Sequence, residues 1–184
     1  MKAACLALAA AAAQLPPCPQ APGWRPVATD ADRQRLRDVR TVWLAALGEA
    51  GRTAAADPLF DPDRALDAPL PPAGTYRCRF VKLGGAVRYA ERDWGRCEIG
   101  RDSLTKFDGP QRPTGRLFLD GESRAVFLGT LLLGDEQRPV RYGRDRRRDM
   151  VGALERVGEA RWRVALPRPG FESTLDLLEI RPGL

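Results

Sequence analysis

The chain has 184 residues, of which 43% are hydrophobic and 29% charged, and its formal net charge is +6. This composition is typical of a single globular domain and excludes a chain that is disordered throughout. Histidine is absent, which excludes imidazole as a catalytic base or a metal ligand. Arginine supplies nearly all of the positive charge, because the only lysines are Lys2, Lys82 and Lys106.

The positive charge does not by itself indicate a nucleic-acid partner. A nucleic-acid-binding face gathers basic residues on one side and interleaves aromatic residues for stacking, whereas here acidic residues lie among the arginines almost everywhere. The densest basic run, residues 144–149, contains two aspartates and is interpreted as a solvated loop. Its alternative is anion binding, for instance to phosphate groups on a membrane surface.

Residues 1–13 predict a secretory signal peptide, which would place the mature protein in the periplasm or envelope. A single charge at Lys2 precedes an Ala/Leu run of about eleven residues, too short to span a bilayer. The alternative is the N-terminal helix of a cytosolic protein. Prolines recur through residues 14–28, which argues against a continuing helix and predicts an extended tether.

Cys18 follows this leader closely, where a lipoprotein carries its lipid. Lipid attachment favours a small residue directly before the cysteine, whereas this chain has Pro17, so lipidation of Cys18 is only one of two interpretations. A lipid there would be the only expected contact with a membrane. No later segment approaches about 18 uninterrupted apolar residues, so no transmembrane helix is expected.

Residues 29–51 predict one amphipathic helix, capped by Thr29 or Asp30 and ended by glycines. Its apolar residues recur at three- and four-residue steps and form one stripe. The members of the stripe are Leu36, Val39, Trp43, Ala46 and Leu47. We expect this stripe to pack against a sheet; an arginine-rich helix lying on a membrane is the alternative.

Residues 52–73 carry turn and breaker signals and are expected to form a long loop. From Gly74 the hydrophobic period changes to two, and residues 74–184 read as an antiparallel β domain. Turn signals at Asp120-Gly121 and Gly158-Glu159 indicate hairpins. About eight short strands with such turns predict a mainly β fold, a small antiparallel barrel or sandwich that follows the single helix.

Cys78 and Cys97 lie in two of these strands and are expected to form a disulfide in an oxidising compartment. Such a crosslink would stabilise the fold by roughly 3 kcal/mol on the chain-entropy estimate. Two buried free thiols are the alternative. A metal site is not expected, because two cysteines without histidine do not close a zinc shell.

Three polar residues are the candidates for binding or chemistry. Glu172 and Asp176 are paired carboxylates near the last strand, an arrangement that glycoside hydrolysis uses, although surface or ion-paired carboxylates are the alternative. Arg112 lies in the run GPQRPTG, residues 109–115, and either pairs with Glu172 or clamps an anionic ligand. No phosphate-binding or dinucleotide motif is present, and no cofactor is expected.

Several segments, taken together and in order, resemble a known bacterial family. They are residues 28–33, 72–79, 82–84, 94–97, 109–115, 152–156, 161–163 and 171–176. Over about residues 25–182 the chain is similar to domain of unknown function 4893. The resemblance implies an exported bacterial protein and supplies no activity, cofactor or catalytic residue. It favours a shared structural or binding role for Cys78, Cys97, Arg112, Glu172 and Asp176.

The sequence therefore predicts a non-enzymatic periplasmic barrel that binds a small ligand or contacts an envelope protein. The enzyme alternative is a hydrolase that uses Glu172, Asp176 and Arg112. A further alternative is an inhibitor or interaction module, which would present residues 109–114 as a rigid exposed loop.

Overall fold

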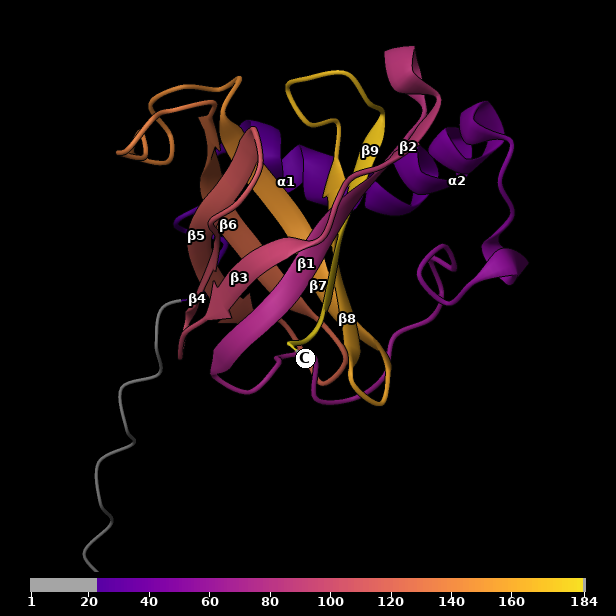
Figure 1. Ribbon diagram of the computed structural model, residues 1–184, viewed down its shortest axis with the longest axis horizontal. Helices are drawn as coiled ribbons and strands as arrows, with labels where there is room; N and C mark the ends of the chain where they lie inside the picture. Colours follow the sequence, from indigo (N-terminus) through magenta and orange to yellow (C-terminus); the bar gives the residue numbers. More distant parts are fainter. Residues whose placement is uncertain (1–22, 184) are drawn as a thin grey trace, which may run out of the picture.

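The computed structural model of the protein describes residues 23–183. The expected signal peptide, Cys18 and most of the expected tether lie outside these residues. Nine antiparallel strands and two helices make up the described domain (Figure 1). The strands are β1 (Gly74–Leu83), β2 (Tyr89–Glu91), β3 (Gly95–Ile99), β4 (Ser103–Lys106), β5 (Gln111–Leu119), β6 (Ala125–Leu133), β7 (Asp149–Gly158), β8 (Arg161–Pro167) and β9 (Leu175–Pro182). The helices are α1 (Asp30–Arg37) and α2 (Val39–Ala50).

Eight of the strands form a closed barrel. Each strand from β3 to β9 pairs with the next, and β9 returns to pair with β1, which pairs in turn with β3. The extra strand, β2, pairs only with the last three residues of β1. Closure removes the free edges that an open sheet would present. The mainly β prediction is confirmed, and the fold is the barrel rather than the sandwich.

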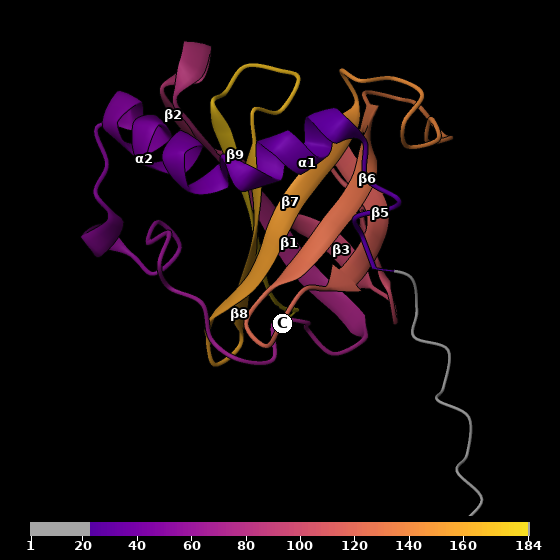
Figure 2. The same ribbon diagram turned by 180° about the vertical axis from the view of Figure 1, so that it is seen from behind.

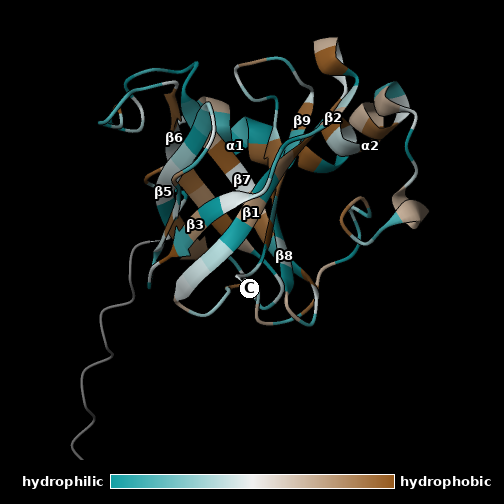
Figure 3. Ribbon diagram, viewed as in Figure 1, coloured by the Kyte–Doolittle hydropathy of each residue, from teal (hydrophilic) through white to brown (hydrophobic). Residues whose placement is uncertain are grey.

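The barrel interior is a packed apolar core to which all eight strands contribute. In β1 the inward residues are Tyr76, Cys78 and Phe80, which alternate with outward residues as the sequence pattern predicts. Figure 3 shows hydrophobic and hydrophilic residues mixed along most of the other strands, whereas β6 is apolar on both of its faces. At one end Tyr76 packs edge-to-face against Trp162, with ring centroids 5.9 Å apart.

The helix predicted over residues 29–51 is two helices that meet at Asp38. Thr29 caps α1 by accepting a hydrogen bond from the backbone N–H of Asp32. The α1 helix packs on the outer face of β5–β7, whereas α2 packs on β8, β9 and β1, where Trp43 is buried. Because the barrel surface curves, a single straight helix could not bury its apolar side on both patches. Figure 2 shows the two helices crossing this outer surface.

No helix among residues 23–183 is long and apolar enough to cross a membrane.

The run that the sequence pattern places in a loop, residues 109–115, is mostly strand. β5 begins at Gln111 and pairs with β6 along its whole length, from Gln111↔Leu133 to Leu119↔Ala125. Pro113 lacks an N–H and interrupts the alternation, which is why the local pattern indicated a loop. Pairing with the long apolar strand β6 overrides that local signal. Gly109 and Pro110 are exposed, but residues 111–114 are strand, so the rigid exposed loop that the inhibitor alternative placed at residues 109–114 is wrong.

Candidate functional site

A cavity of about 720 Å³ opens at one end of the barrel. Four segments converge on it: the β2–β3 connection, the β4–β5 turn, the end of β6 and the β8–β9 connection. Its apolar walls are Phe80, Trp94, Leu133 and Phe171. Its volume lies in the range that binds small molecules, and its walls are of the apolar kind that such sites use. Small barrels hold ligands at this position, the mouth.

Lys106 is the buried cation of the cavity wall. It lies at the end of β4 opposite Cys97, faces the interior and is 5% exposed. Its ammonium donates a hydrogen bond to the backbone carbonyl of Asp108, and it forms no ion pair within the described residues. Burial lowers the pKa of Lys106, and the charge of Arg112 lowers it further, whereas Asp108 opposes both.

A second buried lysine, Lys82, lies beside the cavity and holds both predicted carboxylates. Lys82 faces Asp176 across β1 and β9, and its Nζ is 2.9 Å from Asp176 Oδ2. The same Nζ is 3.8 Å from Glu172 Oε2. The structure therefore brings Glu172 and Asp176 to one cation, and that cation is Lys82 rather than the Arg112 that the sequence suggested for Glu172.

Asp176 and Glu172 differ in their access to a ligand. Asp176 is 2% exposed, and burial raises its pKa although Lys82 and the Ser173 hydroxyl donate to it. Glu172 lines the cavity with its side chain 43% exposed, and Arg92 Nη2 lies 3.3 Å from its Oε2. Asp176 is thus a structural counter-ion of Lys82, and Glu172 is the carboxylate that a ligand in the cavity would meet.

This pairing does not fit a carboxylate-based hydrolase. A glycosidase needs one protonated and one free carboxyl group on either side of a substrate. Here Asp176 is closed off and both carboxylates contact the same lysine. The geometry of Glu172 and Asp176 therefore does not support the hydrolase alternative.

Arg112 does not join the cluster of Glu172, Asp176 and Lys82 but contacts the backbone that follows β6. Its guanidinium donates to the backbone carbonyls of Gly134, at 2.9 Å, and Glu136, at 2.6 Å, which ties β5 to the chain after β6. The expected pairing with Glu172 does not form, because Glu172 contacts Arg92 and Lys82 instead. Register decides this difference, since Arg112 pairs across to β6 and Glu172 lies on the β8–β9 connection.

The sequence pattern did not identify Lys82 and Lys106 as residues of the candidate site. A signal for Lys82 is present, because it continues the inward series of Tyr76, Cys78 and Phe80 in β1. Lys106 follows two residues after the buried Leu104 in the same way. Both lysines of the described domain therefore face the barrel interior.

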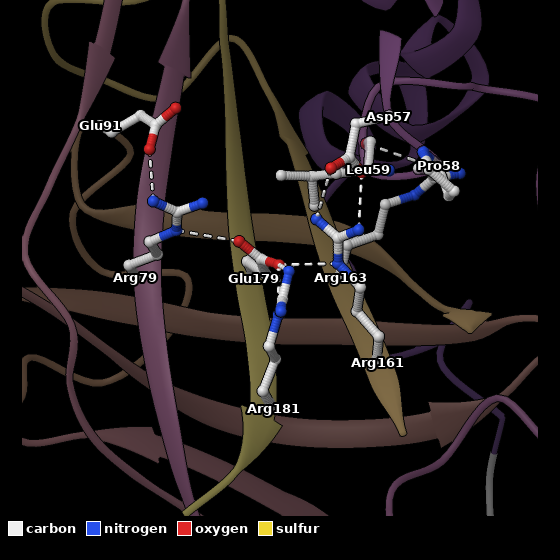
Figure 4. Close-up of polar contacts among 9 residues, drawn as sticks. All are labelled: Asp57, Pro58, Leu59, Arg79, Glu91, Arg161, Arg163, Glu179 and Arg181. Atoms are coloured by element: carbon white, nitrogen blue, oxygen red, sulfur yellow. Dashed lines mark hydrogen bonds and ion pairs between the residues drawn. The ribbon is translucent and has the colours of Figure 1, made fainter. Parts of the chain in front are cut away.

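The outer face of β1, β8 and β9 carries a separate network of charges (Figure 4). Glu179, fully buried, accepts hydrogen bonds from Arg79 Nε at 2.9 Å and from the Nε atoms of Arg161 and Arg181 at 2.7 Å each. Arg161 also pairs with Asp57 of the segment before the barrel. This network fastens that segment to the barrel.

Arg163 completes the attachment of that segment. It is fully buried, forms an ion pair with Glu155 at 2.7 Å, and lies over the ring of Trp43. It also donates to the backbone carbonyls of Pro58 and Leu59 (Figure 4). Burial lowers the pKa of Arg163 and raises that of Glu155. These partners satisfy the buried guanidinium of Arg163, so its role is structural.

Cys78 and Cys97 form a disulfide between β1 and β3, as the sequence predicts. Both residues are fully buried in the barrel core. Among residues 23–183 no group of three or more acidic or cysteine side chains is placed to hold a metal ion.

Comparison with known proteins identifies one family. Searches of curated proteins and of solved structures give no match. Residues 24–180, which hold both helices and nearly all of the barrel, match the family described as Domain of unknown function (DUF4893). The chain therefore belongs to the DUF4893 family.

Proposed function

We propose that the domain is a non-enzymatic binding protein that holds one small ligand in the cavity at the barrel mouth. The ligand has an apolar or aromatic body and an oxygen acceptor, either a carboxylate or a carbonyl, at one end. The observation that carries the proposal is Lys106, a buried cation in the cavity wall whose hydrogen-bond partner is a single backbone carbonyl. A ligand oxygen would satisfy its remaining donors.

The rest of the cavity wall supports an amphipathic ligand. Phe80, Trp94 and Phe171 offer aromatic surface against which a flat or hydrocarbon body can pack. Arg92 also stands at the cavity wall with its side chain about half exposed, and its guanidinium, which pairs with Glu172, is a second donor for a ligand oxygen.

We further propose that the protein acts after export to the periplasm. The Cys78–Cys97 disulfide supports this compartment, because disulfides persist in oxidising surroundings.

The test is a titration with 8-anilinonaphthalene-1-sulfonate, an anionic aromatic dye that fluoresces in apolar sites. We expect one dye per protein and about tenfold weaker binding to Lys106→Met, because a lost charged hydrogen bond is worth at least about 1.4 kcal/mol. The matched control is Arg101→Met, which removes an exposed cation outside the cavity. Equal affinity for the native protein and Lys106→Met would overturn the proposal.

A further inference from the structure

We propose that Lys106 forms a reversible imine with an aldehyde or ketone group of the ligand in the barrel-mouth cavity. This inference rests on the proposed function and names the reactive group of its ligand.

Lysine is rare in this chain, whose basic residues are nearly all arginine. The sequence has 30 basic residues, of which only three are lysines. A guanidinium binds carboxylates in a bidentate manner but does not lose its proton in proteins, whereas a buried lysine does so readily. Lys82 is explained by its ion pair with Asp176. Lys106 has no such partner within the described residues, so the distinctive property that it offers is its amine.

The surroundings of Lys106 give it a larger fraction of neutral amine, the nucleophilic form, than an exposed lysine has at the same pH. Burial and the charge of Arg112 lower its pKa, and the opposing charge of Asp108 does not cancel them. The other charged groups of the cavity wall are Arg92, Asp93 and Glu172. A neutral amine that donates one N–H to the Asp108 carbonyl keeps its lone pair free for attack.

The backbone around the amine leaves room for a reactant. Gly95 and Gly109 flank it, and a Cβ placed on them would lie only 3.2 Å and 3.4 Å from Nζ. Because neither residue has a side chain, neither crowds the nitrogen, and Lys106 lines the cavity beside them. The ring of Phe80 and those of Trp94 and Phe171 would hold the body of the ligand.

The covalent step balances without a further reactant. The Lys106 nitrogen attacks the carbonyl carbon, the carbonyl oxygen takes up a proton, and a carbinolamine forms. Loss of that oxygen as water, with the two hydrogens that came from the amine, leaves the carbon–nitrogen double bond. Hydrolysis reverses the step and releases the ligand unchanged, so no oxidant or reductant is consumed.

The experiment traps the imine with sodium cyanoborohydride. The purified protein is incubated at neutral pH with 4-carboxybenzaldehyde, which joins an aromatic ring, a carboxylate and an aldehyde. Intact-mass and peptide mass spectrometry then count and locate the adducts. The background is low, because only three lysines and the chain's own terminus carry amines. We expect one adduct at Lys106, formed at least tenfold faster than at any lysine of the urea-unfolded protein.

Two controls separate the imine from binding alone. Lys106→Arg keeps a cation and should lose the adduct, and its circular dichroism shows whether it still folds. Terephthalate, which carries a carboxylate in place of the aldehyde, should displace the fluorescent dye without forming any adduct. Displacement of the dye by both compounds without an adduct at Lys106 overturns the imine and leaves the proposed function standing. If binding of the fluorescent dye does not depend on Lys106, the proposed function itself is overturned.

An adduct confined to Lys82 or to the chain terminus would also overturn the inference. If Lys106→Arg does not fold, the comparison of native with unfolded protein decides, because equal rates of labelling would show that the folded site does not activate Lys106.

Discussion

Asp176 and Lys82 form the buried ion pair on which the interior polar cluster depends. They are 2% and 1% exposed and lie 2.9 Å apart. Such a pair adds little net stability compared with apolar residues, but removal of one member leaves an uncompensated charge in the core.

We therefore predict that Asp176→Asn lowers the free energy of unfolding by about 3 kcal/mol. Urea unfolding followed by circular dichroism measures the change. The matched control is the double variant Lys82→Met with Asp176→Leu, which removes both charges and should recover most of the loss. If Asp176→Asn is as stable as the native protein, Lys82 is not buried as a cation.

Lys106 differs from Lys82 because no carboxylate within the described residues pairs with it, so burial makes its charged form unfavourable. Its pKa in the folded state is lower than the ordinary value of 10.5. The folded protein therefore loses relative stability as pH falls from above 10.5 through the lowered pKa, where the folded state must take up the proton against burial.

We predict that Lys106→Met gains stability relative to the native protein between pH 11.5 and pH 7, because only the native protein must then bury a charged amine. Denaturant unfolding of both proteins at the two pH values measures this difference. A difference that is the same at both values would mean that Lys106 titrates as it does in the unfolded chain.

At the scale of elements, the Cys78–Cys97 disulfide joins β1 to β3, next to the point where the barrel closes. The two residues are separated by 19 positions in the sequence and are fully buried. β1 is the strand that pairs with β3 on one side and β9 on the other, so the crosslink holds the closing strand in place.

We predict that the variant Cys78→Ala with Cys97→Ala folds but loses about 3 kcal/mol of stability on the chain-entropy estimate. Thermal unfolding measures the loss. The native disulfide should resist dithiothreitol until the barrel unfolds, because both sulfurs are shielded from solvent. Rapid reduction without a change in circular dichroism would contradict that shielding.

At the scale of the whole molecule, the barrel depends on α1, α2 and the segment before β1 to cover its outer face. Apolar residues of β1, β6, β7 and β9 point outward beneath them. They include Val81, Leu83, Val126, Leu128, Val151 and Leu177. A barrel without this cover would expose a large contiguous apolar patch, which promotes association.

We predict that a chain that begins at Arg52 unfolds or self-associates, whereas a chain that begins at Gly23 keeps the melting temperature of the full chain. Size-exclusion chromatography with light scattering compares the two. A well-folded, monodisperse chain from Arg52 would show that the helices do not contribute to the barrel.

Much of the architecture could be predicted from local patterns. Alternation at Tyr76, Cys78 and Phe80 placed these residues inside, and the turn at Asp120-Gly121 predicted the β5–β6 hairpin, both of which the structure confirms. These signals need only neighbouring residues, because strand alternation and tight turns are short-range properties. The single predicted helix became two because the curvature of the barrel, which no local pattern records, decides where a helix must bend.

The sequence by itself determined the strand pattern, the pair of cysteines, the absence of imidazole chemistry and the kinship with the DUF4893 family. The tertiary structure alone decided which polar side chains meet. Lys82 and Asp176 are 94 residues apart and touch only because β9 pairs with β1 in one register. Register between distant strands is set by the packing of the whole core, so the partner of Lys82, and the isolation of Lys106, exist only once the barrel has closed.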